Sequence, residues 1–149
     1  MKNIKGIILA GGMGTRLYPL TKVTNKHLLP LGGEPMIYYP LRTLKQIGIT
    51  EVCIVSGKEH YGQIMNQLGS GDEYGVDITY RVQDKPGGIA QALSLCEGFA
   101  GDEPITVCLG DNIFEDNFSS LQQGLFTTEW IDSFCDEDPK NHIFLKKVP

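Results

Sequence analysis

The sequence LAGGMGTRL, residues 9–17, follows an apolar run, Ile4–Leu9, whose composition predicts a buried strand. Three of the four residues from 11 to 14 are glycine, so this loop carries little side-chain bulk and its backbone N–H groups can close on an anion. Arg16 adds a permanent cation that suits bidentate contact with phosphate. The pattern indicates a nucleotide-binding site, and its alternative is an ordinary glycine turn with solvated basic residues.

Two common nucleotide motifs do not fit this loop. The dinucleotide fingerprint G-x-G-x-x-G needs a glycine or alanine three residues after Gly14, where this chain has Leu17. The P-loop needs a Gly-Lys-Ser/Thr sequence, which does not follow. Hydride transfer, which uses a dinucleotide cofactor, is therefore a distant third hypothesis after the two functions given below. Two further cations, Lys22 and Lys26, come next in the chain.

The whole segment GGMGTRLYPLTKVTNKHLLP, residues 11–30, resembles the signature GGxGTRLxPLTxxxxKxLLP of the sugar-1-phosphate nucleotidylyltransferases. It looks most like the glucose-1-phosphate thymidylyltransferases of bacterial deoxysugar pathways. The nucleotide contacts that this resemblance and the motifs below indicate are Leu9, Gly11, Gly12, Gly14, Thr15, Arg16, Lys26, Gln83, Pro86, Gly88 and Asp111.

The composition is that of one globular domain, and it argues against nucleic acid and membranes as partners. The chain has 149 residues, is 41% hydrophobic and carries a formal charge of −5, so nucleic acid is not an expected partner. No apolar run approaches the roughly 20 residues that span a bilayer, and no signal peptide is expected. The four cysteines form no C-x-x-C pair, so we expect structural thiols and a reducing cytoplasm.

Apolar segments alternate between strand and helix patterns along the chain. Strands are expected at 4–9, 51–56, 76–82 and 104–109. Helices are expected from about 36 to 47, with Pro35 suited to the first turn and Gly48 to the stop, at 58–68, from 89 to about 99, and at 116–123. This order predicts an α/β, Rossmann-like, doubly wound and mainly parallel sheet. In a strand order 3-2-1-4, the first and fourth strands are neighbours where the winding reverses, and ligands bind outside their carboxyl ends.

Asp111 follows the fourth strand, and this topology places it beside the glycine loop. A carboxylate there can hold a Mg²⁺ ion that bridges triphosphate oxygens. The sequence Gly110-Asp111-Asn112 also resembles the metal-binding G-D-N of the family. The alternative is an aspartate that caps the following segment.

Gln83 follows the third strand, and its amide has the donor and acceptor that reading a pyrimidine edge requires. The sequence QDKPGGIAQA, residues 83–92, resembles the family motif Q-x-x-P-x-G-L-A-Q-A, in which the glutamine and the second glycine, here Gly88, contact thymine or uracil. The alternative is a turn before a glycine-rich helix entry. The three histidines, His27, His60 and His142, suggest no catalytic or zinc site.

The resemblance implies that a sugar-1-phosphate oxygen attacks the α-phosphorus of a nucleoside triphosphate and that pyrophosphate leaves. It implies a loop that holds the triphosphate, Arg16 stabilising pyrophosphate, Lys26 neutralising the α-phosphate, and Asp111 holding Mg²⁺. The implied substrates are dTTP, or UTP, and glucose-1-phosphate, which give dTDP-glucose. A homo-oligomer is allowed but not indicated.

The resemblance lapses after about Phe118, so we expect a nucleotide-binding domain at 1–124 and a divergent acidic tail at 125–149, without the C-terminal half of the family fold. Residues 115–138 hold seven acids and no Lys or Arg. Trp130-Ile131-Asp132 resembles the start of the family's W-x-D-x-G-T motif, whose aspartate is a second metal ligand, or matches it by accident. Two hypotheses remain, a thymidylyl-type enzyme and a truncated module that binds nucleotide with little or no turnover.

Overall fold

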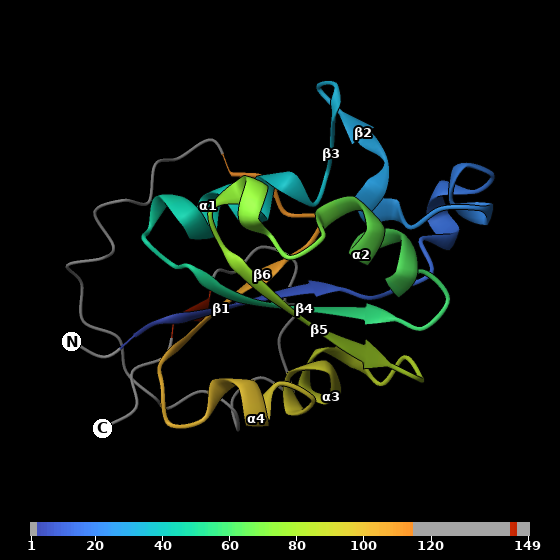
Figure 1. Ribbon diagram of the computed structural model, residues 1–149. Helices are drawn as coiled ribbons and strands as arrows, with labels where there is room; N and C mark the ends of the chain where they lie inside the picture. The colour runs from blue at the N-terminus through green and yellow to red at the C-terminus, as the bar shows by residue number, and fades with distance from the viewer. Residues whose placement is uncertain (1–2, 115–143, 146–149) are drawn as a thin grey trace.

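A sheet of five strands forms the centre of the chain, whose computed structural model describes residues 3–114 and 144–145 (Figure 1). The strand order is β5-β4-β1-β6-β7, where the strands are β1 (Lys5–Ala10), β4 (Glu51–Gly57), β5 (Asp77–Gln83), β6 (Ile105–Leu109) and β7 (Phe144–Leu145). The first four are parallel, and β7 pairs antiparallel with β6. The predicted order 3-2-1-4 is confirmed, and each predicted strand lies within one residue of its position.

Helices cover both faces of the sheet (Figure 1). On one face lie α1 (Tyr38–Gln46) and α2 (Tyr61–Leu68), and on the other lie α3 (Gly88–Ser94) and α4 (Glu97–Ala100). Side chains of a strand alternate between faces, so Ile8 joins the core under α1 and α2, whereas Ile7 joins the core over α3. From Gly6 to Ala10 β1 is buried on both faces, so this part of its sequence carries no polar side chain. The doubly wound α/β prediction is confirmed.

The segment before α1 differs from the prediction. Residues 30–35 form a hairpin of β2 (Pro30–Leu31) and β3 (Glu34–Pro35), joined by two glycines. Pro35 therefore pairs with Pro30 instead of opening a helix, and α1 begins at Tyr38. The predicted stop of that helix before Gly48 is confirmed.

Two other helices differ from the prediction. The segment from Lys58 forms a turn, and α2 begins at Tyr61. The predicted helix 89–99 is divided into α3 and α4, because the chain turns at Cys96 and buries that side chain against the sheet. The predicted helix 116–123 lies outside the described residues.

Cys53, Cys96 and Cys108 are free thiols buried in the two cores, as expected for structural cysteines. The Sγ atoms of Cys53 and Cys96 lie 3.6 Å apart. Cys135 lies outside the described residues. Among those residues, no helix has the length and apolar character needed to cross a membrane.

Gly6 is a close-packed position on β1. A Cβ atom there would lie 2.7 Å from Leu44 Cδ1 and 3.2 Å from Ile49 Cγ2, both in the core under α1. We expect Gly6→Val to lower the free energy of unfolding by about 1–3 kcal/mol, because overpacking forces these side chains apart. Urea unfolding measures the change. Gly57→Val is the matched control, since nothing lies within 4 Å of its Cβ position; an equal loss in both variants would contradict the packing argument.

Candidate nucleotide-binding site

The glycine loop leaves the carboxyl end of β1 and turns back through short 3-10 turns at Thr15–Leu17 and Leu20–Lys22. Gly14 has a φ of 58°, a value that residues with a side chain rarely adopt. A Cβ there would also lie 2.9 Å from Thr21 Cγ2, while the hydroxyl of Thr21 donates to the Gly14 carbonyl over 2.6 Å. The hydrogen bond closes the loop, and the positive φ together with the close approach of Thr21 explains why a glycine suits position 14.

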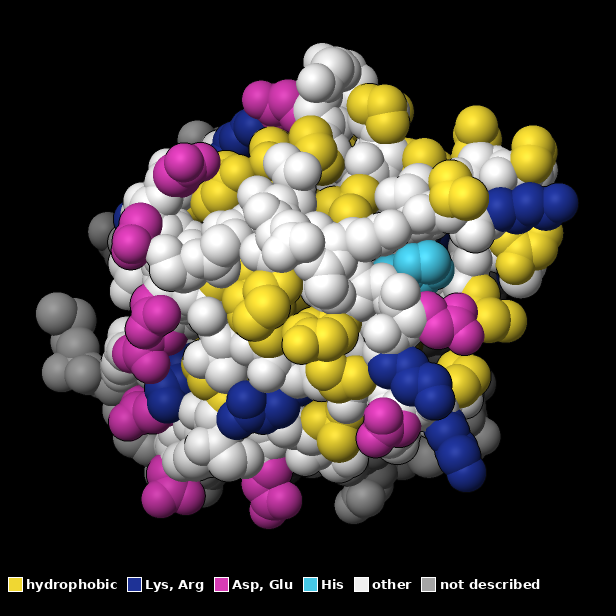
Figure 2. All heavy atoms as spheres, turned by 45° about the vertical axis from the view of Figure 1, so that its right-hand side comes forward, with side chains coloured by type: hydrophobic (Ala, Val, Ile, Leu, Met, Phe, Trp, Pro, Cys, Tyr) yellow, Lys and Arg dark blue, Asp and Glu magenta, His cyan; other side chains and the backbone are white. Residues whose placement is uncertain are grey.

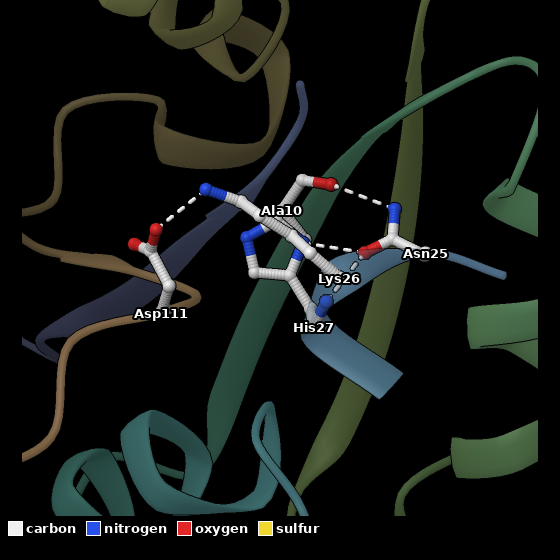
Figure 3. A network of polar contacts seen from close by, with 5 residues as sticks. All are labelled: Ala10, Asn25, Lys26, His27 and Asp111. Atoms are coloured by element: carbon white, nitrogen blue, oxygen red, sulfur yellow. Dashed lines mark hydrogen bonds and ion pairs between the residues drawn. The ribbon is translucent and has the colours of Figure 1, made fainter. Parts of the chain in front are cut away.

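Lys26 and Asp111 meet across this end of the sheet. Lys26 Nζ lies 2.5 Å from Asp111 Oδ2, although 85 positions separate the two residues (Figure 3). The contact joins the segment after the glycine loop to the segment after β6. Burial of Asp111 acts to raise its pKa, but the hydrogen bond and the charge of Lys26 outweigh burial and hold the pKa below the usual range. Asp111 is therefore a carboxylate with a cation beside it.

A buried polar network holds the backbone next to Lys26. Asn25 Nδ2 donates to the carbonyl of Ala10, at the end of β1, over 3.4 Å. Asn25 Oδ1 accepts from the backbone N–H of His27 at 2.8 Å and from His27 Nδ1 at 2.5 Å (Figure 3). Because Oδ1 can only accept, Nδ1 carries the proton of the imidazole ring. The network joins the end of β1 to both neighbours of Lys26 in the sequence.

His27 is fully buried and neutral. Burial and, to a smaller extent, the positive charge of Lys26 lower the pKa of His27 to about 3. The negative charge of Asp111 opposes this shift. Its ring also lies against Gly110, where a Cβ would approach within 2.7 Å of His27 Cδ2. The place of His27 between Asn25 and Gly110 gives it a structural role that the sequence pattern does not reveal.

Gln83 lies at the end of β5, two strands away from β1. Its side chain is buried and reaches the glycine loop, since a Cβ on Gly11 would lie 2.9 Å from Gln83 Oε1. Gln83 Nε2 donates to the carbonyl of Gly88 at 3.3 Å and to Gln91 Oε1 at 2.5 Å. The structure therefore brings the predicted glutamine, the second glycine of its motif and the glycine loop together.

Other predicted residues are less closely connected. Leu9 is buried, and its carbonyl accepts from the Gly110 N–H at 2.8 Å. Gly12, Thr15, Arg16 and Pro86 are exposed, and within residues 3–114 no hydrogen bond or ion pair joins Arg16 to Lys26 or Asp111. Asp132 lies outside the described residues.

The glycine loop and the hairpin also expose apolar side chains. Most of the exposed large hydrophobic residues of the described part come from this stretch, namely Met13, Leu17, Tyr18, Leu20, Val23 and Leu31. Figure 2 shows hydrophobic side chains gathered on this side of the molecule, with Lys or Arg among them. The predicted phosphate-binding loop thus lies at the surface, and the segment after it is held by the buried side chains of Asn25 and His27.

The carboxylate of Asp111 is the metal ligand that the sequence predicts at this edge of the sheet. Within the described residues, no group of three or more His, Cys, Asp or Glu side chains could hold a metal ion. Mg²⁺ is usually held by one or two carboxylates together with substrate phosphates and water, so a single aspartate beside a polyphosphate site fits such an ion. Asp111 is the aspartate that the sequence predicts for this role.

Comparison with known proteins agrees with this geometry. The sequence profile of the family described as nucleotidyl transferase matches residues 5–127. Glucose-1-phosphate thymidylyltransferases of Neisseria meningitidis and Xanthomonas campestris are 47% and 48% identical to this chain over 111 and 114 residues. These matches cover 74% and 76% of the chain but 38% and 39% of the relatives, so the chain spans about two fifths of their length.

Solved structures match the same part of the fold. A Bacillus anthracis protein assigned as a glucose-1-phosphate thymidylyltransferase, in complex with sucrose, has 62% identity and a TM-score of 0.76, over 78% of this chain and 48% of that one. A UDP-glucose pyrophosphorylase complexed with UDP-glucose has 29% identity and a TM-score of 0.63, over 80% of this chain and 50% of that one. The strand order, the loop after β1 and the sequence matches lead to one conclusion: the chain belongs to the nucleotidyl transferase family.

Proposed function

We propose that the chain binds dTTP, or UTP, at the carboxyl ends of β1, β5 and β6 and transfers its nucleotidyl group to glucose-1-phosphate. The products are dTDP-glucose and pyrophosphate, which would serve deoxysugar or cell-surface polysaccharide synthesis. The observation that carries the proposal is that Gln83 reaches Gly11 while Lys26 meets Asp111 at the same edge of the sheet. A base-reading amide, a glycine loop and a charged pair are the parts that a nucleoside triphosphate needs.

In this proposal the base lies against Gln83, and the triphosphate lies over the backbone N–H groups of the glycine loop. An oxygen of the sugar phosphate attacks the α-phosphorus, the bond from that phosphorus to the bridging oxygen breaks, and pyrophosphate leaves with the bond's electron pair. Lys26 neutralises charge on the α-phosphate, and Arg16 stabilises the leaving pyrophosphate. Both side chains act through position and charge, without a covalent intermediate on the protein.

The ion pair between Lys26 and Asp111 is, in this proposal, the state of the two side chains before a nucleotide binds. Both side chains are part-exposed, at 24% and 37%, so the pair is accessible to an incoming polyphosphate. A phosphate competes with Asp111 for the ammonium group of Lys26, which leaves the carboxylate of Asp111 available to a cation. When bound, Mg²⁺ supplies charge neutralisation across the phosphate oxygens, and Asp111 is the side chain that would hold it.

A second candidate is a module that binds nucleotide and turns over little or not at all. The observation in its favour is that the described residues contain no group of three or more His, Cys, Asp or Glu side chains that could hold a metal ion. The two candidates are separated by measuring pyrophosphate release from dTTP, Mg²⁺ and glucose-1-phosphate beside equilibrium dTTP binding, with the full-length Neisseria meningitidis relative assayed in parallel.

For the 149-residue chain we expect measurable binding of MgdTTP with dTDP-glucose formation far below that of the full-length relative. A site that holds one reactant but does not orient the second loses a proximity contribution on the order of 7 kcal/mol or more. Chromatographic detection of dTDP-glucose measures the product. Synthesis at the relative's rate would contradict the expected deficit and exclude the binding-module candidate, whereas absence of dTTP binding would overturn the proposed function.

Asp111→Asn should weaken Mg²⁺-dependent dTTP binding about tenfold, a loss of ~1.4 kcal/mol, because the amide removes the charge that attracts the ion. The thermal midpoint should change little, since the side chain is partly exposed. Titration calorimetry with and without Mg²⁺ measures the effect. Asp102→Asn, in an exposed turn, is the matched control. The metal assignment is wrong if Asp111→Asn binds MgdTTP as tightly as the unaltered chain.

Base recognition gives a competition test. If Gln83 and Gly88 lie against a pyrimidine, UTP should displace bound dTTP far better than ATP does, since a purine does not fit the same edge in the same orientation. A filter-binding competition with labelled dTTP measures the displacement. Equal displacement by ATP would be strong evidence against base reading by this segment.

A further inference from the structure

Two cysteines of the chain lie against each other in the core that α3 covers. Cys53 is in β4, Cys96 lies at the turn between α3 and α4, and neither side chain is exposed to solvent. Their Sγ atoms are 3.6 Å apart, although 43 positions separate the residues. A disulfide bond is about 2.05 Å long, so an approach of about 1.5 Å would join the two sulfur atoms. The fold thus brings together two thiols that are distant in the sequence.

The two thiols differ in how readily they lose a proton. The hydrogen bond with Cys96, together with the positive charge of Arg81, holds the pKa of Cys53 below its ordinary value, and burial opposes this shift. The same hydrogen bond and burial raise the pKa of Cys96. Because the thiolate is the reactive form of cysteine, Cys53 is the more reactive thiol of the pair.

Arg81 belongs to β5, the strand next to β4 in the sheet. It pairs with Val55, which follows Cys53 by two residues on β4. Cys53 and Val55 belong to the core that α3 covers, and alternate residues of a strand share a face, so the side chain of Arg81 leaves the sheet on that same face. A cation on this face favours a thiolate at Cys53.

The part of the chain that covers the pair is thin. Helix α3 has seven residues and α4 has four, and among the residues of these two helices, all of them described, only Ala92 is buried. Short elements with few buried side chains open locally at a lower free energy than the strands of a core do. A small oxidant can therefore reach the two sulfur atoms through this cover while the sheet stays folded.

We propose that Cys53 and Cys96 are a site of reversible oxidation, at which a peroxide converts the two thiols to a disulfide between β4 and the turn after α3. The inference goes beyond the proposed function, since it requires neither a nucleotide nor Mg²⁺. In the reduced chain the two side chains fill the core. In the oxidised chain the bond fastens α3 and α4 to the sheet.

The oxidation takes place in two steps. The thiolate of Cys53 attacks one oxygen of hydrogen peroxide, the O–O bond breaks, and the departing hydroxide takes up the proton that Cys53 released and forms water. The sulfur of Cys96 then attacks the sulfur of the resulting sulfenic acid, the S–O bond breaks, and hydroxide leaves with the proton of Cys96 as a second water. In all, the two thiols lose two electrons, and one peroxide is reduced to two molecules of water.

Cys108 provides an internal control. It is buried to the same degree as the pair, but it lies in the core on the opposite face of the sheet. Burial raises the pKa of Cys108 to about 12. Because the sheet separates its thiol from the other two, selective oxidation of Cys53 and Cys96 would not be a general property of the buried cysteines.

The test treats the reduced 149-residue chain with hydrogen peroxide, blocks the remaining thiols with an alkylating agent and identifies linked peptides by mass spectrometry. Cleavage after Lys, Arg and Glu places the four cysteines in different peptides. We expect the peptide that links Cys53 to Cys96 to exceed any linked peptide with Cys108 or Cys135 about tenfold, and dithiothreitol to release it. Cys135→Ser should give the same product.

Two variants test the order of the steps. In Cys96→Ala, Cys53 should stop at a sulfenic acid that dimedone traps, because the second thiol is missing. In Cys53→Ala, Cys96 should remain open to alkylation. Recovery of both thiols unoxidised at a peroxide concentration that oxidises a free cysteine peptide would overturn the proposal. So would linkage through Cys108 as abundant as that between Cys53 and Cys96, since the reaction would then reflect general unfolding.

Discussion

The parallel pairing of β1 with β6 is the constraint on which the rest of the site depends. It sets Leu9 opposite Leu109, so the glycine loop and the segment of Asp111 leave the sheet side by side. The Gly110 N–H continues the pairing by donating to the Leu9 carbonyl at 2.8 Å. A side chain at Gly110 would collide with that carbonyl and with the ring of His27. The juxtaposition of loop and carboxylate is therefore built into the backbone of the sheet.

A buried polar network secures the residue that faces Asp111. Asn25 and His27 are almost fully buried, and such groups are costly unless their hydrogen bonds are made. Here the amide of Asn25 joins the carbonyl of Ala10 to His27, whose neutral ring presents its Nδ1 proton to Asn25 Oδ1. Lys26 lies between these two anchored residues in the sequence. Its backbone is held by the network, and in the proposed function its side chain exchanges Asp111 for a phosphate.

Much of this architecture could be predicted from the sequence, because strong patterns carried it. Uninterrupted apolar runs marked the parallel strands, and the positions of Gly11, Gln83 and Asp111 just after strands placed them at one edge of the sheet. Pro35 misled the prediction, because a proline suits both a helix start and a turn, and pairing with Pro30 decided between them. The break at Cys96 escaped it, since burial against Cys53 is a tertiary effect.

The parts of the site that the sequence did not reveal are the ones that orient other residues. Asn25 and His27 act through partners brought from other segments, and no local pattern distinguishes such residues from ordinary polar ones. Their roles follow from the direction of hydrogen bonds, which a pattern of residue types does not contain. Arg16 is the opposite case. The motif predicts a role for it, but its side chain is exposed and forms no hydrogen bond or ion pair with Lys26 or Asp111.

Amide hydrogen exchange with and without dTTP and Mg²⁺ tests the central claim most directly, because the claim is that backbone N–H groups at this edge of the sheet hold the nucleotide. The account predicts slower exchange in residues 11–16, around Gly88 and in residues 110–112, with little change in the hairpin 30–35 or in α4. Unchanged exchange in residues 11–16 under saturating nucleotide, or protection confined to the opposite edge of the sheet, would contradict it.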